Sequence, residues 1–469
     1  MTKRPASQEL DHDPILAKKF SHLKIDSRTD LASIQNFALS ILENRNLAQY
    51  VRKLTFTFYH WASYPAQALP YTAMTPEEQE KETRFKAAIE EQKWEEPEAT
   101  ELLKRLMATS PAPGSGFRQR TSHQLFPDAV VALLLPILPN LEYWVVGEID
   151  RPHFVEKAVQ RAKDEFFGSI SVSRLKIITN TPYSNAAWED ISWGAFEIYA
   201  NLPSLKSISG KGVGGIGVED GGQYEAVPRK ASAVREIHFK QCEISGACVS
   251  KIINFSTALE AFTYRFGGRA GDGGIAGWCS PKIAKDFTPH RLTMRSLNLD
   301  VERQLHGSLE QEIQSWVEEM KEEKEDRAAD QDSEEEDSDT ATLNSADSTK
   351  SATNWDEAIK SNPFFPNLTY LRINIKLAVR FAELSGKKTL TEWLPPSLEE
   401  LEIVGYRHDE EGEMAEVVRR REEILPNLRV LKGVDEYIEN GKELVSEDDY
   451  VASAASDDED RVDVSDDSD

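Results

Sequence analysis

Apolar residues recur along this chain in a short phrase, L-x-x-L-x-L, in which other apolar residues also occupy the leucine positions. The phrases begin at Val51, Leu141, Leu175, Leu205, Val234, Leu259, Met294, Leu368, Leu398 and Leu428. From Leu141 onward the starts are 34, 30, 29, 25, 35, 74, 30 and 30 residues apart, and the 90 residues from 51 to 141 equal about three such intervals. This regularity predicts a structural repeat of about 30 residues.

Each phrase predicts a short strand, because its last two apolar positions alternate with polar ones and so face one side. The residues between phrases show helical spacing, for example in 153–167, 245–262 and 413–425. The recurrent Leu-Pro predicts a helix end before the next strand. A single unit cannot bury its own apolar edge, whereas stacked units can. We therefore expect an α/β fold, an irregular leucine-rich-repeat-like solenoid with a parallel concave sheet.

The same alternation predicts which side chains face outward from the sheet. It places Trp144 in the core, and it directs outward Tyr143, Glu236, His238, Thr263, Arg265, Asn298, Tyr370, Arg372 and Glu402. Aromatic and arginine side chains on a rigid surface are typical of protein-binding hot spots. We predict that this concave set contacts a protein partner; the alternative for each residue is an ordinary solvated strand face.

The net charge of −26 is concentrated in two segments. Residues 310–340 contain 15 acids and 3 bases, and residues 447–469 contain 11 acids and 1 base. These segments carry −12 and −10, which leaves about −4 for the remaining chain. Much of both is too polar to form a core, so disorder is expected there. No basic stripe is evident along the sequence, and nucleic acid is not an expected partner.

These patterns divide the chain into segments with different expected structures. They are an N-terminal tail (1–20), the first helix and strand of the repeat domain (21–63), a charged helical excursion and linker (64–125), the first part of the repeat domain (126–309), an acidic helix with a disordered insert (310–355), the C-terminal part of the repeat domain (356–440) and a disordered acidic tail (441–469).

Motifs for catalysis or cofactor binding are weak. Residues 212–217 match G-x-G-x-x-G, but further glycines and a proline follow where a dinucleotide site needs a helix, so we predict a loop. Residues 267–278 form a second glycine-rich loop, expected on the same rim. No metal-ligand spacing occurs, and we expect no enzyme activity, cofactor or metal. The three cysteines and the lack of a long apolar run predict an intracellular protein, cytoplasmic or nuclear, without membrane contact.

The phrases ISGACVSKIINFSTALEAFTYRFGG, PHRLTMRSLNLD, FPNLTYLRINI, LPPSLEELEIVG and EEILPNLRVLKGV resemble the repeat region of fungal F-box-type leucine-rich-repeat proteins. The resemblance covers about 20–434. It implies a substrate receptor in which an N-terminal F-box binds a Skp-type adaptor of a cullin ubiquitin ligase and the repeats bind the substrate. Only about 20 residues precede the repeat region, so we expect the F-box itself to be absent or truncated.

Three hypotheses on function follow from the sequence. The first is a non-enzymatic protein-interaction module acting as a receptor of a cullin-type ligase, with a Skp-type adaptor and a cullin as partners. The second is an acidic scaffold or chaperone-like binder of basic proteins with no link to a ligase. The third and most distant is a dinucleotide-binding enzyme that uses the glycine-rich residues 212–217.

Overall fold

The structure is a computed structural model. It describes residues 14–26, 31–57, 74–107, 125–146, 153–163, 170–178, 189–202, 204–217, 232–267, 278–301, 304–305, 308–315, 317–318, 365–405 and 411–433. Within these residues no helix is long and apolar enough to cross a membrane. The glycine-rich residues 268–277, the linker at 111–116 and most of the two acidic segments lie outside the described ranges.

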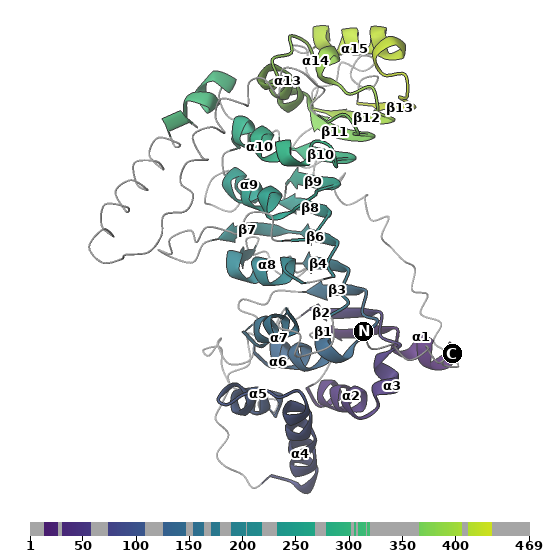
Figure 1. Ribbon diagram of the computed structural model, residues 1–469, viewed down its shortest axis with the longest axis vertical. Coiled ribbons are helices and arrows are strands. Elements are labelled where there is room, and N and C mark those ends of the chain that lie inside the picture. Colours follow the sequence, from purple (N-terminus) through teal and green to yellow (C-terminus); the bar gives the residue numbers. More distant parts are fainter. Residues whose placement is uncertain are drawn as a thin grey trace, which may run out of the picture.

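Eleven parallel strands form one sheet, and their spatial order follows the sequence (Figure 1). The strands are β1 (His22–Asp26), β2 (Lys53–Thr57), β3 (Tyr143–Val146), β4 (Arg174–Ile178), β6 (Ser207–Lys211), β8 (Glu236–Cys242), β9 (Ala261–Phe266), β10 (Ser296–Asp300), β11 (Tyr370–Asn374), β12 (Glu400–Val404) and β13 (Val430–Lys432). Strands β5 (Glu189–Ser192) and β7 (Val213–Gly217) pair separately. The chain is thus a mixed α/β protein with a parallel sheet.

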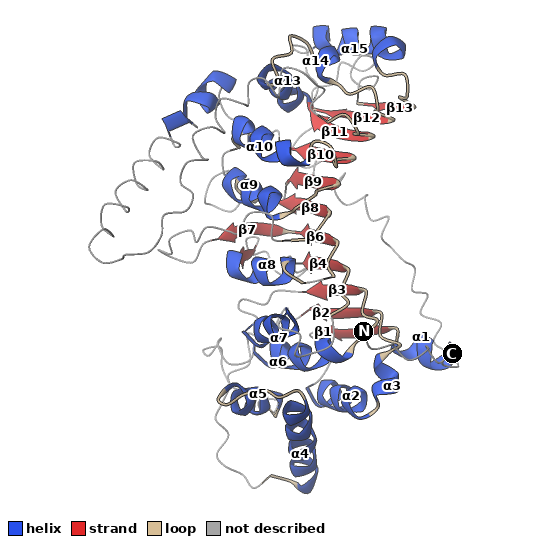
Figure 2. Cartoon of the chain, in the orientation of Figure 1, coloured by secondary structure: helices blue, strands red, loops and turns tan. Residues whose placement is uncertain are grey.

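Helices connect the strands, and Figure 2 shows α6 to α10 beside the same face of the sheet. The described α-helices are α1 (Pro14–Phe20), α2 (Leu31–Glu43), α3 (Arg45–Ala48), α4 (Pro76–Glu91), α5 (Glu98–Leu106), α6 (Leu125–Leu134), α7 (His153–Lys163), α8 (Trp193–Ala200), α9 (Gly246–Phe255), α10 (Ser280–Phe287), α13 (Ile375–Leu384), α14 (Leu390–Trp393) and α15 (Glu411–Ile424). The short 3₁₀ helices η2 (Leu135–Ile137) and η3 (Thr288–His290) precede β3 and β10. Helices α7, α9 and α15 confirm the helical spacing seen in the sequence.

The core lies between the sheet and these helices. One residue on each of the nine strands from β2 to β12 forms a continuous row in the strand register. Each of these side chains is at most 1% exposed: Leu54, Trp144, Leu175, Ile208, Ile237, Phe262, Leu297, Leu371 and Leu401. Apolar side chains are buried on the helix side, and most side chains on the opposite side of the sheet are polar; Val145 on β3 is an apolar exception. The predicted alternation is therefore confirmed for Trp144 and for Leu401.

Several of the phrases have a polar side chain one position before their first residue. These polar side chains connect neighbouring strand–helix units by hydrogen bonds. Asparagine and hydroxyl side chains donate to main-chain carbonyl oxygens of the preceding unit: Asn140 to Gln49 (2.8 Å), Asn367 to Leu292 (2.7 Å), Asn427 to Pro396 (2.9 Å), Ser397 to Leu368 (2.7 Å) and Thr293 to Leu259 (2.7 Å). A main-chain carbonyl near a turn needs such a donor. The recurrent Leu-Pro-Asn and Pro-Ser therefore serve as links between units.

The structure corrects the predicted repeat frame at two places. Leu175 pairs with Trp144 and Ile208, so its unit begins at Val172 and not at Leu175. Strand β2 pairs directly with β3, so no further strand lies between them in the sheet, and the described residues of this 90-residue interval between the two strands are in helices, turns or connecting segments. In addition, β1 begins at His22, in a phrase (Phe20 to Ile25) that the repeat series had not included.

Helices α4 and α5 occupy part of this long interval between β2 and β3. A capping box starts α4, since the Glu78 amide donates to Thr75 Oγ1 (3.2 Å) and the Thr75 amide donates to Glu78 Oε2 (2.8 Å). Phe85 and Leu102 are fully buried, which anchors the two charged helices to the core next to α2 and α6. They therefore belong to the folded body of the protein.

Candidate functional site

The face of the sheet opposite the helices carries the outward strand side chains, and we call it the outer strand face. It consists of three register rows across the strands. The first row contains Tyr143, Glu236 and Tyr370; the second contains His238, Thr263, Asn298, Arg372 and Glu402; the third contains Arg265. All nine residues predicted from the sequence therefore lie on this one face, spread from β3 to β12.

Tyr143 is the centre of a cationic cluster on β2 to β4. The Lys53 Nζ lies 5.1 Å from the centroid of the Tyr143 ring, and the Arg174 Cζ lies 5.9 Å from it on the other side in the register. Cations at these distances are attracted by the negative ring face. These two cation–ring contacts hold the half-buried Tyr143 ring between two positive charges. A ring held in this way is a suitable contact for a bound polypeptide.

His238 and Thr263 are register partners in the middle of the face. The His238 Nδ1 lies 3.0 Å from the Thr263 Oγ1, and burial lowers the pKa of His238. Thr263 is only 6% exposed, so it offers little surface to a partner. Glu236 is exposed on the same strand as His238. Of these three predicted contact residues, Glu236 and His238 are accessible and Thr263 mainly supports His238.

Arg372 is held in a network of hydrogen bonds with acidic and amide side chains. Its Nη1 donates to Asp300 Oδ2 and to Asn298 Oδ1, both at 3.2 Å, and its Nε donates to Glu402 Oε1 at 2.8 Å. The side chains of Arg372 and Asp300 are 11% and 4% exposed. Burial lowers the pKa of Arg372, but the carboxylates of Asp300 and Glu402 outweigh it and raise the pKa overall. Arg372 therefore ties three strands together and presents little free charge.

Tyr370 lies beside this network on β11. Burial, and then the negative charge of Glu402, raise the pKa of its hydroxyl, which stays protonated at neutral pH. Its register neighbours are Ser296 and Glu400, so a half-buried ring is bordered by a small and an acidic side chain. Such an amphipathic ring suits an interface that is apolar at its centre and polar at its edge.

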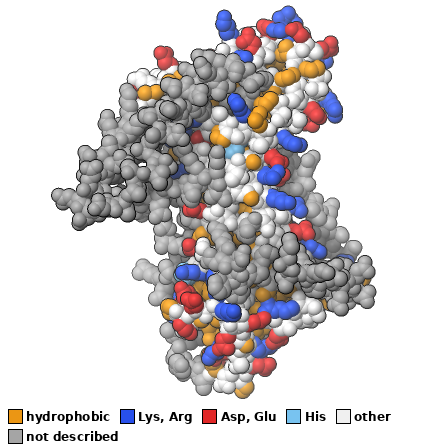
Figure 3. Space-filling model, viewed as in Figure 1, with side chains coloured by type: hydrophobic (Ala, Val, Ile, Leu, Met, Phe, Trp, Pro, Cys, Tyr) orange, Lys and Arg blue, Asp and Glu red, His pale blue; other side chains and the backbone are white. Residues whose placement is uncertain are grey.

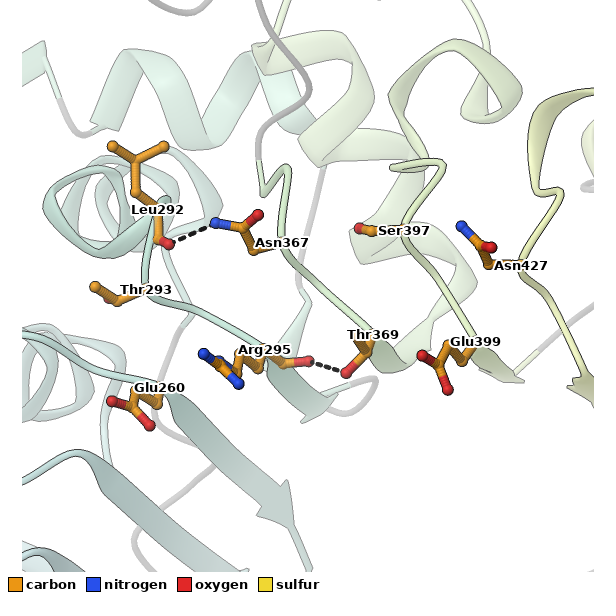
Figure 4. A pocket seen from close by; sticks show the side chains of 9 residues that line it. All are labelled: Glu260, Leu292, Thr293, Arg295, Asn367, Thr369, Ser397, Glu399 and Asn427. Carbon is orange, nitrogen blue, oxygen red and sulfur yellow. Dashed lines mark hydrogen bonds between the residues drawn. The ribbon is translucent and has the colours of Figure 1, made fainter.

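A groove of about 600 Å³ lies beside the turns that precede β10 to β13 (Figure 4). It is lined by Glu260, Leu292, Thr293, Arg295, Asn367, Thr369, Ser397, Glu399 and Asn427. Several lining polar groups already have partners, because they belong to the links between units; Thr369 Oγ1, for example, donates to the Arg295 carbonyl at 3.1 Å. Leu292 is 63% exposed and is the apolar element of this groove. No pattern in the sequence predicted this groove.

Charged side chains also form pairs at the turns before the strands. Arg52 pairs with Glu142 (3.1 Å) and Arg235 with Glu260 (2.5 Å), in each case between successive strands of the sheet. The view in Figure 3 shows Lys and Arg side chains next to Asp and Glu side chains along the described part of the molecule. Exposed ion pairs of this kind contribute little to stability. On the side of the molecule seen in this view, they leave no large area with charge of a single sign.

Positive charges gather on the outer strand face in a way that the linear sequence does not show. Strands β1 to β9 place there Lys24, Lys53, Arg174, Lys176, Lys211, Lys240 and Arg265. The expectation that no basic stripe exists is therefore wrong for this face. Six of these seven cations were missed as candidate residues; applying the alternation rule to every strand would have found them.

Metal-ligating groups, the Cys242 thiol and the glycine-rich residues 212–217 are each candidate sites in the sequence. The described residues contain no cluster of three or more side chains that could hold a metal ion. Burial raises the pKa of the Cys242 thiol to about 12, so this cysteine is not a thiolate at neutral pH. The predicted loop at 212–217 is wrong, because residues Val213–Gly217 form strand β7, which pairs with β5.

Comparisons with known proteins leave the chain without an assigned relative. No protein-family model matches this chain, and a search of curated proteins found no match.

Proposed function

We propose that the chain is a non-enzymatic protein-interaction module, a leucine-rich-repeat-like solenoid whose outer strand face binds a protein partner. The observation that carries this proposal is the register of the parallel sheet. It aligns tyrosine, histidine and arginine side chains from separate units on one face, above a core row that is at most 1% exposed. A rigid support lowers the entropy cost of binding.

The dimensions of this face suit a protein better than a small molecule. Nine neighbouring strands, β2 to β12, present outward side chains, and a spacing of about 4.8 Å per strand gives a length of roughly 40 Å. A stable protein interface needs about 800 Å² per partner, which a face of this length can supply. Small-molecule sites instead enclose their ligand. The groove of Figure 4 is open, and several of its polar groups are already hydrogen-bonded.

A role as receptor of a cullin-type ubiquitin ligase rests on the family resemblance alone. Co-purification of the tagged full chain with a Skp-type adaptor and a cullin supports this role, and their absence from the purified complex removes it. The second hypothesis, binding of basic proteins through the acidic segments, stays a prediction, because most of both segments lies outside the described residues.

The binding proposal is tested by affinity capture with matched variants of the full chain. One variant carries Tyr143→Ser and Tyr370→Ser on the outer strand face. The control carries Lys86→Ser on α4 and Arg419→Ser on α15, which are exposed away from that face. We expect the first variant to lose at least tenfold in affinity for the captured protein and the control to keep it. Equal binding by both variants, with unchanged melting temperatures, would place the interface elsewhere.

A further inference from the structure

The charges of the outer strand face are distributed unequally along the sheet. Strands β1 to β9 supply seven lysines and arginines and one exposed acid, Glu236 on β8. Strands β10 to β12 supply Asp300, Glu400 and Glu402 together with Arg372. In the second group Arg372 is already bonded to Asp300 and Glu402. The excess of lysines and arginines over acids therefore lies on β1 to β9.

Three of these cations are direct register neighbours, and we call them the cation row: Lys211, Lys240 and Arg265. Lys211 on β6 pairs with Lys240 on β8, which pairs with Arg265 on β9. Neighbouring strands are about 4.8 Å apart, and like charges directly opposite each other destabilise a sheet. No ion pair joins Lys211 or Lys240 to a carboxylate within the described part of the chain. Asp300 is the next register neighbour of Arg265, so an anion bound over Lys211 and Lys240 would relieve the repulsion that remains.

A second group of cations surrounds Tyr143. Lys53 and Arg174 flank its ring, and Lys176 stands two residues after Arg174 on the same strand and side. Ser207 and Ser209 on β6 lie between this group and the cation row. These small side chains leave a low, polar path between two positive groups. An extended ligand can therefore contact both.

Resting on the proposed function, we propose that the partner presents an acidic peptide segment, which binds across β2 to β9 with its carboxylates on the Tyr143 group and on the cation row. From β2 to β9 there are five strand spacings, or about 24 Å, the length of about seven residues of extended chain. Charge complementarity over this length supplies specificity and a fast association rate.

An acidic peptide fits this face better than nucleic acid does. The whole chain has a net charge of −26, and Glu400 and Glu402 occupy the same face on β12. A long polyanion would extend over these acids and be repelled, whereas a short acidic segment contacts only the basic strands. Residues 447–469 of this chain, with 11 acids and 1 base, have the same chemistry as the proposed ligand, so we expect them to compete with it.

The test is a binding titration of the full chain with a fluorescein-labelled peptide of alternating Glu and Ser, about 12 residues long. Peptides with Gln or Lys in place of Glu, and a single-stranded oligonucleotide of equal charge, are the controls. The titration is repeated with a second protein in which the acids of 447–469 are replaced by Asn and Gln. Each protein also carries, in turn, Lys240→Glu in the cation row or Lys104→Glu on α5. The two substitutions change the net charge equally, and Lys104 is 70% exposed.

We expect the Glu peptide to bind, with an affinity that falls with added salt and rises when 447–469 is neutralised. Lys240→Glu should weaken binding at least tenfold, and Lys104→Glu less than twofold. Equal effects of both substitutions, binding of the oligonucleotide in preference to the peptide, or no peptide binding even with 447–469 neutralised would overturn the inference. If the Tyr143→Ser and Tyr370→Ser variant still loses its captured partner in that case, the proposed function stands and only the acidic ligand is wrong.

Discussion

Removing the Arg372 side chain distinguishes a structural role on the outer strand face from a binding role. Arg372→Met keeps the length of the aliphatic chain and deletes the charge and all three hydrogen bonds to Asp300, Asn298 and Glu402. The Asp300 carboxylate is 4% exposed, so it would lose the ion pair with Arg372 without gaining water. Breaking a buried pair in this way costs about 3–5 kcal/mol.

The expected cost for Arg372→Met is about 3 kcal/mol, at the lower end, because the third partner Glu402 is 30% exposed and can recover solvation. Urea unfolding followed by tryptophan fluorescence measures it. Glu402→Gln should cost less than about 1 kcal/mol, as expected for a half-exposed partner. Combining Arg372→Met with Asp300→Asn should recover at least about 1 kcal/mol, since the buried carboxylate that lost the Arg372 ion pair is then removed as well. A cost below about 1 kcal/mol for Arg372→Met would refute this reasoning and make Arg372 a free contact residue.

Three further predictions concern the core, a buried acid and the links between units. Leu401→Ala should lower the free energy of unfolding by about 2–5 kcal/mol in urea titrations, because Leu401 is fully buried, and a cost below about 1 kcal/mol would contradict the strand register. Burial raises the pKa of Asp128 from 3.8 to about 7, so the folded state keeps a proton that the unfolded state loses. Stability should therefore fall between about pH 4 and pH 7, and Asp128→Asn should flatten this dependence in thermal melts; an unchanged slope speaks against it. Asn140→Ala deletes a link to the Gln49 carbonyl and should cost about 1 kcal/mol, whereas a neutral result would mean that water replaces the side chain.

The sequence predicted the core well because alternation within a strand is a local property. Trp144 and Leu401 could be placed inside from two or three neighbouring residues. The predicted start of the repeat was wrong at Leu175, because both Val172-Leu175-Ile177 and Leu175-Ile178 fit the phrase. Only the pairing of Leu175 with Trp144 in the sheet shows which of the two is correct. Glycine is disfavoured in strands, so nothing local indicated that 213–217 would pair with β5.

The cation row could not be read from the sequence because its members are far apart along the chain. Lys211, Lys240 and Arg265 are 29 and 25 residues from one another, and each strand contributes one. Only the register brings them together. Arg372 was correctly placed on the outer strand face, but its partner Asp300 comes from a strand 72 residues earlier, across the long acidic insert. The local pattern of apolar and polar residues predicts on which face of the sheet a side chain lies. Which side chains lie next to it depends on how distant strands pair in the folded chain.

Photo-crosslinking from defined positions tests most directly whether the outer strand face is the binding surface. A photoreactive phenylalanine analogue is placed at Ser209, between the Tyr143 group and the cation row, or at Lys86 on α4, away from the face. After irradiation of cells that express the full chain, we predict a crosslinked protein partner from position 209 and none from position 86. A partner captured from position 86 and absent from position 209 would contradict the proposal.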